Sequence, residues 1–197
     1  MKTLRANGIV LRRLDYGEAD RIITLLTYQY GKIRVMAKGV RKQKSKLAGG
    51  IELFSVSELH FIKGRGDIDT LVSTRLRRHY GAIVKDYDRT QTAYAMLGAI
   101  DKILEDTTGH DYFDVLDESL AALDTARIDP ILTEISFTMR VLALLGHVPD
   151  FAVDSKGQHL DPAHHYQFDF DSVSFGADQN GRYDKNHLKV PKLLAYN

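Results

Sequence analysis

The sequence contains no cysteine, no tryptophan and only four prolines in 197 residues. Without cysteine the chain can form no disulfide, thiolate-bound zinc site, iron–sulfur cluster or cysteine nucleophile. Long hydrophobic runs are also missing, since no stretch approaches the roughly 18 apolar residues of a membrane-spanning helix. The basic N-terminus has an apolar run of four residues that ends at Arg12, which is too short for a secretory signal. We therefore expect a soluble, cytoplasmic protein.

Charge is divided unevenly along the chain, although its net value is only +1. Residues 1–80 contain 17 Lys and Arg against 7 Asp and Glu, a balance of +10. Residues 81–197 contain 10 against 19, a balance of −9. A basic half attracts polyanions, nucleic acid first and acidic membrane second. The asymmetry predicts a functional basic half, with solvated faces of no special function as the alternative.

Short runs of β type fill the basic half. Five runs rich in Ile, Val, Leu, Thr, Tyr and Phe are bounded by glycine, aspartate or charged residues, at residues 8–18, 21–32, 33–39, 53–64 and 68–78. Apolar and mostly basic residues alternate over 33–38, which predicts one buried and one cationic strand face. Tyr30-Gly31-Lys32 is short enough to close a hairpin. Five such strands predict a small closed barrel, for which an OB-fold is the commonest architecture.

After Gly81 the apolar period becomes helical. Apolar residues recur on one helical face at residues 93–104 and 113–123. A third helix is predicted from Asp129-Pro130 to Gly146 by its N-cap carboxylate, its first-turn proline and its terminal glycine. The polar tail has alternating aromatics and glycine turns, which predict short hairpins. The predicted fold class is α+β, with an OB-fold barrel at 1–80, an α-helical domain at 81–147 and an irregular or β-hairpin tail at 148–197.

The densest charge lies at residues 38–46, with five cations in nine positions. This segment cannot bury its charges, so we expect a solvent-facing loop. Its Lys and Arg would neutralise phosphates and release counterions without reading sequence, and a purely solubilising loop is the alternative. Further basic residues on the predicted strands and turns favour the first interpretation. The predicted DNA-binding residues are Arg34, Lys38, Arg41, Lys42, Lys44, Lys46, Lys63 and Arg65.

Aromatic residues are interleaved with these cations. OB-folds hold single strands with aromatic faces beside a basic groove, and each stacked base contributes about 1–3 kcal/mol. Some of these rings must instead belong to the core, and the sequence does not say which. The candidates are Tyr16, Tyr28, Tyr30, Phe54 and Phe61.

Histidines and aspartates of the tail are a candidate metal site, since imidazole with carboxylate can hold zinc. Their spacing matches no established site, so we expect no bound metal. The residues in question are His159, His164, His165, Asp154, Asp161 and Asp169.

Motifs of catalysis are missing. The sequence has no HExxH and no GxSxG, and no arrangement of Ser, His and Asp stands out. Gly64-Arg65-Gly66-Asp67 lacks the spacing and the lysine of a phosphate-binding loop, and it predicts a turn. Asp15, Glu18 and Asp20 surround Gly17 and predict an exposed turn. We expect a protein that is not an enzyme and has no catalytic residue.

A series of stretches in the basic half is shared with one bacterial family. They are Gly8–Arg12, Asp15–Ile22, Gly31-Lys32 and Ala37–Arg41, followed by Leu53–Ser55, Glu58-Leu59, Gly64–Gly66 and Leu71. These stretches resemble the opening of the RecO family of recombination-mediator proteins. The resemblance is specific over residues 4–76 and continues as a helical pattern over 82–149. Gly146-His147-Val148-Pro149 is similar to the family's Gly-aromatic-x-Pro stretch.

The resemblance implies an OB-fold, a helical domain and a zinc-ribbon-like hairpin pair. RecO proteins bind single- and double-stranded DNA and anneal complementary strands. With RecR, they help RecA to replace single-stranded DNA-binding protein at gaps. The implied partners are therefore DNA, RecR, single-stranded DNA-binding protein and, indirectly, RecA, in the cytoplasm with the nucleoid. The family's DNA contacts match Arg34, Lys38, Arg41, Lys42, Lys44 and Lys46 here.

The tail departs from the family pattern. Some relatives hold zinc through four cysteines after the helical domain, whereas residues 150–154 of this chain read Asp-Phe-Ala-Val-Asp where the first pair would stand. We therefore expect a zinc-ribbon-like tail without cysteine ligands and no cofactor.

These observations predict a recombination mediator that acts without catalysis. Cations would neutralise phosphates on two strands, and base pairing would stabilise the product, so that no nucleotide need be hydrolysed. With RecR, the protein would assist RecA loading in gap and double-strand break repair. The alternative is a protein–protein adaptor whose acidic helices dock partners while nucleic-acid binding is incidental. An enzyme acting on nucleic acid is a third class, for which the sequence provides no motif.

Overall fold

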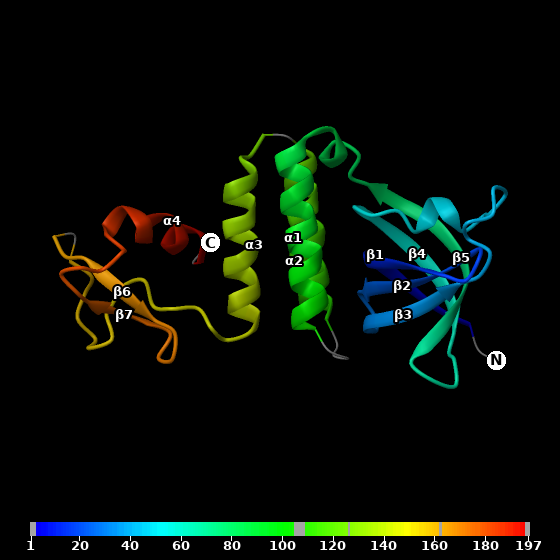
Figure 1. The fold of residues 1–197 in the computed structure, drawn as a ribbon. Coiled ribbons are helices and arrows are strands. Elements are labelled where there is room, and N and C mark those ends of the chain that lie inside the picture. The colour runs from blue at the N-terminus through cyan, green and yellow to red at the C-terminus, as the bar shows by residue number, and fades with distance from the viewer. Residues whose placement is uncertain (1–2, 105–108, 126, 162, 196–197) are drawn as a thin grey trace. The chain divides into compact units, whose positions relative to one another are not determined.

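A computed structural model describes residues 3–104, 109–125, 127–161 and 163–195 (Figure 1). The chain divides into two compact units, Met1–Thr133 and Glu134–Asn197. None of the described helices is long and apolar enough to cross a membrane.

The first unit begins with a closed barrel, as the sequence predicted. Neighbouring strands follow the order β1-β2-β3-β5-β4, and β3 and β5 are parallel whereas the other pairs are antiparallel. Each predicted β run overlaps one of these strands, although the exact ends differ. The strands are β1 (Thr3–Tyr16), β2 (Asp20–Thr27), β3 (Gly31–Ala37), β4 (Ser55–Ile62) and β5 (Ile68–His79).

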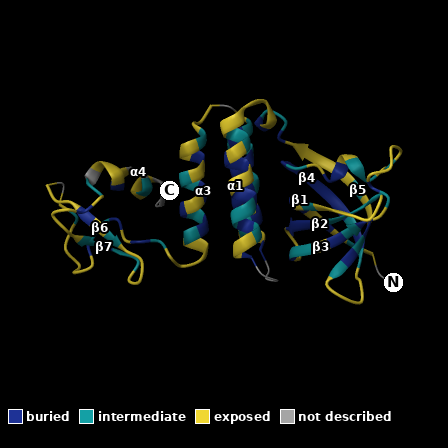
Figure 2. Ribbon diagram, in the orientation of Figure 1, coloured by how far each residue is buried: buried dark blue, intermediate teal, exposed yellow. Residues whose placement is uncertain are grey.

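Alternation along the strands fills the barrel interior. Ile23, Leu25, Val35, Ala37 and Leu59 are fully buried in one core cluster, and Figure 2 shows buried stretches along the barrel strands. Each buried aliphatic side chain of this size contributes about 1.5–3 kcal/mol relative to an exposed one. Because side chains alternate between faces, the intervening residues of β3 point outward. The barrel thus presents one set of residues for stability and another to its surroundings.

The β2–β3 hairpin predicted at Gly31 is confirmed. Gly31 takes a positive φ of 63°, which glycine adopts without steric cost. The Thr27 hydroxyl donates to the Gly31 carbonyl at 2.8 Å and accepts from the Tyr30 amide at 3.1 Å. These bonds fix the register in which Thr24 faces Arg34.

Two helices, α1 (Tyr87–Ile103) and α2 (His110–Asp124), complete most of the first unit. The Asp86 carboxylate caps α1 by accepting from the Arg89 amide at 2.9 Å. The helices cover part of the outer barrel surface, where Ile9 is fully buried and the Tyr28 ring meets Phe113 edge-on at 5.6 Å. Short 3-10 turns, η1 (Ala48–Gly50) and η2 (Ile83–Lys85), precede β4 and α1.

The third helix, α3 (Pro130–Leu144), has the predicted start and stop. The Asp129 carboxylate accepts from the Ile131 amide at 2.8 Å. Gly146 has a φ of +72°, and the His147 amide donates to the Leu142 carbonyl at 2.9 Å. This is the terminating geometry that a glycine after a helix favours.

The second unit contains a two-stranded sheet, β6 (Tyr166–Asp169) and β7 (Ser174–Ala177), and the helix α4 (Lys185–Ala195). The predicted tail has its hairpin here, but α4 is an addition that the sequence reasoning did not include. Pro191 lies inside α4, where proline is normally unfavourable. The helix starts nevertheless, because the Asp184 carboxylate accepts from the Asn186 amide at 2.8 Å and the His187 amide at 3.0 Å. The unit's buried core comprises Met139, Phe151, Tyr166, Phe175 and Leu188.

Candidate nucleic-acid interface

The outer face of β1, β2 and β3 carries aligned rows of side chains. Arg12 pairs with Thr24 and Thr24 with Arg34, so these three residues form one row across the strands. Lys38 follows the last residue of β3 and is the next exposed position after Arg34 on this side. At the rise of an extended strand it lies about 13 Å from Arg34. We call this outer surface, from Arg34 to Lys38 and the neighbouring positions of β1 and β2, the strand face. Arg34 and Lys38 are both exposed on it.

A loop rich in lysine continues the strand face beyond β3. We define residues 38–47 as the lysine loop, in which Lys38, Lys42, Lys44 and Lys46 are exposed. Its turns are closed by the backbone, with the Lys42 amide donating to the Gly39 carbonyl at 3.1 Å. The loop projects from the barrel in Figure 1 as the light-blue segment after β3. The sequence-based expectation of a solvent-facing loop is therefore confirmed.

The base of the lysine loop is held to the β1–β2 turn. The Asp20 carboxylate accepts from the Gly39 amide at 2.7 Å, and the Arg41 amide donates to the Ala19 carbonyl at 2.9 Å. These bonds hold the first part of the loop, from Gly39 to Arg41, beside the β1–β2 turn at the end of the strand face.

The turn between β4 and β5 lies at the other end of the strand face. A pocket of about 300 Å³ opens there between β3 and this turn. Arg34 and Lys63 contribute cations to it, Tyr30 contributes a ring, and Asp67 and Asp69 contribute carboxylates. Two of the predicted residues, Arg34 and Lys63, thus line this pocket, five lie in the lysine loop, and Arg65 lies in the β4–β5 turn outside the pocket lining.

Some of the predicted cations form an ion pair with a carboxylate and others do not. Arg34 lies 3.5 Å from an Asp67 oxygen, and Lys63 lies 3.5 Å from an Asp69 oxygen. Arg41 lies 3.6 Å from an Asp15 oxygen. Within the described ranges, the other five form no ion pair, namely Lys38, Lys42, Lys44, Lys46 and Arg65. These five are the cations most available to phosphate.

Asp15 is an anion at the edge of the site that its neighbours hold ionised. The Arg21 guanidinium donates to its carboxylate at 2.7 Å. This hydrogen bond, assisted by the charges of Arg21, Arg41 and Arg13, lowers the pKa of Asp15 below its ordinary value. The carboxylate therefore offsets Arg21 and Arg41 and leaves the lysine loop as the net positive part of the site.

The sequence reasoning missed an apolar row on the strand face. Leu14 pairs with Ile22 and Ile22 with Met36 in the strand register. Leu14 is 56% exposed, and Ile22 and Met36 are half-buried. The row lies between Arg34 and Lys38, so an apolar strip separates these two exposed cations. The signal in the sequence is the spacing of Arg12, Leu14 and Tyr16. Residues at every second position of a strand lie on the same face, which places Leu14 beside Arg12 and Tyr16 on the outer surface.

The structure separates the candidate aromatics into core and surface. Phe54 and Phe61 are buried, and Tyr28 packs on Phe113. Tyr16 is 54% exposed beside the β1–β2 turn, and Tyr30 lines the pocket near Arg34. These two rings lie one at each end of the strand face.

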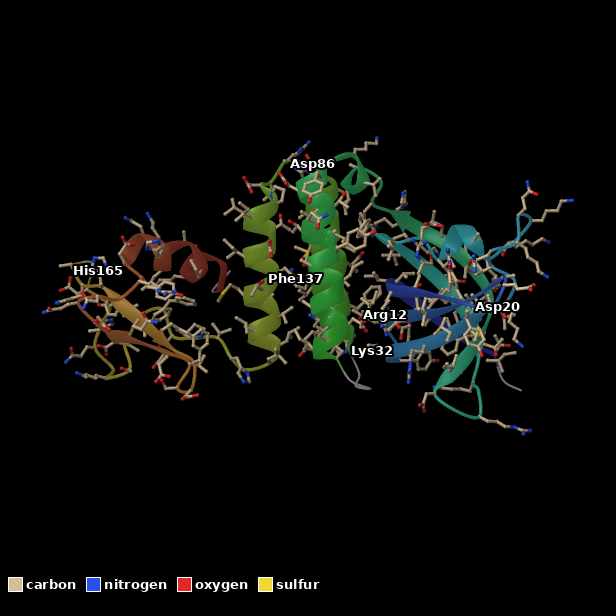
Figure 3. The ribbon with its side chains drawn as sticks, viewed as in Figure 1. Arg12, Asp20, Lys32, Asp86, Phe137 and His165 are labelled. Atoms are coloured by element: carbon tan, nitrogen blue, oxygen red, sulfur yellow. The ribbon has the colours of Figure 1, made fainter. Side chains whose placement is uncertain are left out.

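Two further cations of β1 and β3 are turned toward the helices. The Lys32 ammonium donates to the Asp101 carbonyl at 2.6 Å and lies 3.4 Å from its carboxylate. The Arg12 guanidinium lies 3.4 Å from the same carboxylate. Figure 3 shows Arg12 and Lys32 on the side of the barrel that faces α1, with Asp20 at the far end. Asp101 thereby marks the boundary between the helix contact and the strand face.

The tail residues at the position of the family's first cysteine pair do not fit a zinc site. Phe151 is buried in the core of the second unit. The Asp150 carboxylate accepts from the Ala152 amide at 2.7 Å, and Asp154 accepts from the Lys156 and Gln158 amides at 2.9 and 2.8 Å. These carboxylates close turns by binding backbone donors. Among the residues that the structure describes, no three His, Asp or Glu side chains are grouped to hold a metal ion.

Comparison with known proteins finds one family for both parts of the chain. The family model described as Recombination protein O N terminal matches residues 1–80, and Recombination protein O C terminal matches residues 84–197. DNA repair protein RecO of Bifidobacterium longum subsp. infantis is 39% identical over 152 residues, covering 76% of this chain and 63% of that protein. The Streptomyces avermitilis protein of the same name is 36% identical over 160 residues, with coverages of 77% and 64%.

A more distant relative agrees with these two. DNA repair protein RecO of Desulfitobacterium hafniense is 32% identical over 150 residues, which cover 76% of this chain and 54% of that protein. The matches thus span 54% to 64% of the length of these three curated relatives. Because the barrel and the segment after it each match the corresponding part of a single family, the chain belongs to the RecO family.

Proposed function

We propose that this protein is a DNA-binding recombination mediator that anneals complementary single strands. Relatives that match most of this chain carry the name DNA repair protein RecO. The observation that carries the proposal is the strand face, where an apolar row lies between exposed Arg34 and Lys38 and continues into the lysine loop. Such a surface binds the two chemically different parts of a single strand, its phosphates and its bases.

The proposed mechanism uses binding alone. Lys42 and Lys44 of the lysine loop neutralise phosphates and release counterions, while Tyr16 and Tyr30 stack on bases at the two ends of the strand face. Two strands whose charges are neutralised repel one another less, so that complementary bases meet more often. Base pairing then stabilises the duplex. No bond is made or broken, and the mechanism needs no catalytic residue, cofactor or nucleotide.

The proposal includes the partners that the family resemblance implies. Together with RecR, the protein would help RecA to replace single-stranded DNA-binding protein on gapped DNA. The lysine loop would hold the DNA while the coating protein is displaced. The acidic second half of the chain, with a balance of −9 over residues 81–197, is the part that we assign to protein contacts.

Strand annealing tests the proposal. Two complementary oligonucleotides, each labelled with one dye of an energy-transfer pair, are mixed with the protein at two salt concentrations, with and without single-stranded DNA-binding protein. We expect faster annealing without added nucleotide, and a smaller acceleration at the higher salt because phosphate contacts are screened. A protein that leaves the annealing rate unchanged at both salt concentrations would refute the proposal. Partner binding that survives nuclease treatment, together with micromolar or weaker DNA affinity, would indicate the adaptor instead.

A further inference from the structure

The outer surface of β1, β4 and β5 carries a second group of basic residues. Arg5 of β1 pairs with His60 of β4, and His60 pairs with Ser73 of β5. In the neighbouring row, Asn7 pairs with Glu58 and Glu58 with Arg75. Equivalent positions in the two rows are two residues apart, about 7 Å along an extended strand. We call these two rows, together with Arg77, the β1–β4–β5 face.

A single carboxylate organises the guanidinium groups of this face. Arg5 Nη2 donates to Glu58 Oε2 at 2.7 Å, and Arg77 Nη2 donates to the same oxygen. The hydrogen bond from Arg77, followed by that from Arg5, lowers the pKa of Glu58 from 4.5 to about 2. Glu58 therefore remains ionised at neutral pH and holds both guanidiniums in place. Each guanidinium has five N–H donors, so several remain for a ligand.

Arg77 lies at a bulge in β5. The register between β4 and β5 shifts at Val56/Ser57, so that Ser57 pairs with Leu76 and Val56 with Arg78. Arg77 is the extra residue between these two pairs. It follows Arg75 by two residues on the same strand, and its guanidinium reaches the Glu58 carboxylate there.

The β1–β4–β5 face has a positive balance and is open to solvent. Three guanidiniums are offset by one carboxylate, which leaves a charge of about +2. The Arg5 side chain is 67% exposed. In the part of the chain that the structure describes, Arg75 forms no ion pair. Because Arg75 is exposed and unpaired, it is the cation most available to an incoming anion.

The other polar groups of this face also suit a phosphate backbone. The His60 ring lies 3.0 Å from the Ser73 hydroxyl and 3.5 Å from the Glu58 carboxylate. Hydroxyls and guanidinium forks are among the groups that proteins use to contact phosphate and sugar. A protein partner would instead require an apolar centre, whereas both rows consist of polar side chains. A nucleic-acid backbone is therefore the favoured ligand.

We infer that the β1–β4–β5 face is a second phosphate-binding surface, which holds the backbone of a second nucleic-acid strand on the same barrel. The inference rests on the proposed function, in which the strand face and the lysine loop bind the first strand. Arg5 and Arg12 are seven residues apart on β1, up to about 23 Å along the strand, so the two footprints are separate. Two strands on one protein meet at a high effective concentration, because their encounter becomes intramolecular.

The number of strands bound per protein tests the inference. The full-length chain is mixed with an excess of two oligothymidylates, which cannot pair, one carrying a donor dye and the other an acceptor. We expect energy transfer with the wild type, because both strands occupy one barrel. The Arg75→Glu variant should lose this transfer through an about tenfold weaker second binding event, while its first binding event is unchanged.

Matched variants separate the inference from the proposed function. Lys85→Glu reverses another exposed cation of the same unit, one without an ion pair among the described residues, and should retain transfer. Lys42→Glu/Lys44→Glu should weaken the first binding event. If that double variant binds as the wild type does, the proposed function fails. If it binds weakly but Arg75→Glu retains transfer, only the second surface is refuted. Arg75→Gln, which should weaken transfer less, and thermal melting of each variant exclude unfolding as the cause.

Discussion

Three acidic residues each lie close to two cations of the barrel. Asp101 is close to Arg12 and Lys32 where the barrel meets α1, and Glu58 binds Arg5 and Arg77 on β1, β4 and β5. Asp15 balances the base of the lysine loop. An exposed ion pair contributes little to stability, so the main effect of these carboxylates is to position guanidiniums and ammoniums. The lysines beyond Arg41 are left for ligands.

At the residue scale, Lys42→Ala/Lys44→Ala is expected to weaken single-strand binding without unfolding the protein. Both side chains are exposed and neither supports the core. Loss of two phosphate contacts should reduce the slope of log affinity against log salt by about 1.4. Salt titrations of a fluorescent oligonucleotide measure this slope.

Lys85→Ala is the control for that double variant, because Lys85 is exposed on η2, away from the lysine loop. It should bind DNA with the wild-type slope. Equal slopes for the double variant and the wild type would remove the lysine loop from the interface. A lower melting temperature of the double variant would instead show that the loop contributes to the fold.

Glu58 predicts a loss of stability in acid. Its pKa falls from 4.5 to about 2 on folding, chiefly through the hydrogen bond from Arg77. A carboxyl group whose pKa is lower in the folded protein stabilises the fold at every pH above its pKa in the unfolded chain. This contribution disappears as the pH falls to the pKa of the folded protein. The midpoint of urea unfolding should therefore decline between pH 4.5 and about 2. The Glu58→Gln variant should show a smaller decline there.

Glu18→Gln is the matched control for the acid titration. Glu18 is exposed in the β1–β2 turn and forms no ion pair with any residue that the structure describes. The midpoint of urea unfolding of this variant should decline over the same pH range by as much as that of the wild type. If Glu58→Gln also follows the wild type, the two guanidiniums do not stabilise the ionised carboxylate.

Individual residues of the site were only partly predictable. The exposure of Lys42 and Lys44 followed from charge density, because so many cations cannot be buried together. The ion pairs of Arg34 and Lys63 depend on Asp67 and Asp69 of a different strand and turn. The Asp101 contact to Lys32 joins residues 69 positions apart. Such contacts follow from the tertiary fold, which local sequence patterns do not specify.

At the scale of elements, periodicity was sufficient for the barrel and for three helices. Strand alternation and helical spacing both arise from burial on one face, which the spacing of apolar residues records directly. The fourth helix, α4, lacks that clarity because Pro191 interrupts it. Its start depends on Asp184, whose capping role was readable from a carboxylate before a run of helix-forming residues.

Gly181 of the second unit lies so close to β6 that we expect substitution there to be destabilising. A Cβ added at Gly181 would lie 2.4 Å from the Tyr166 carbonyl carbon and 2.5 Å from its oxygen. Gly181→Ala must therefore displace the backbone bridge between Tyr166 and Tyr183. We expect a destabilisation of about 1–3 kcal/mol, measured by thermal unfolding, and faster proteolysis of the tail.

Gly176→Ala provides the comparison within the same sheet. A Cβ there would meet Ser155 Oγ at 3.7 Å, an ordinary contact distance. This variant should remain close to the wild type in melting temperature and in proteolysis rate. Similar losses in both variants would indicate that β propensity, and not the close approach of Tyr166, limits the substitution.

At the scale of the whole molecule, the uneven charge distribution predicts a strong salt dependence of binding. If about five cations contact phosphates of a single strand, log affinity should fall with log salt at a slope of about −3 to −4. The net charge of +1 would not suggest this, because the acidic half cancels the basic half in the sum. A slope near zero across the titration would contradict phosphate binding.

Whole-molecule features set the limit of what the sequence could predict. The barrel was predictable from the number and spacing of its strands, but the parallel pairing of β3 with β5 joins segments separated by some thirty residues. That pairing closes the barrel and aligns the turn after β4 with Arg34. The pocket containing Lys63 and Arg34 therefore exists only after closure, and no local pattern encodes it.

The same closure has a consequence for how partners recognise the protein. Every strand of the barrel has a hydrogen-bonded neighbour on each side over at least part of its length, so most of its backbone donors and acceptors are already used within the barrel. Over that paired part an extended peptide cannot add itself as another strand. Recognition there proceeds through side chains, and single substitutions on this surface can therefore abolish one contact while the backbone scaffold stays intact.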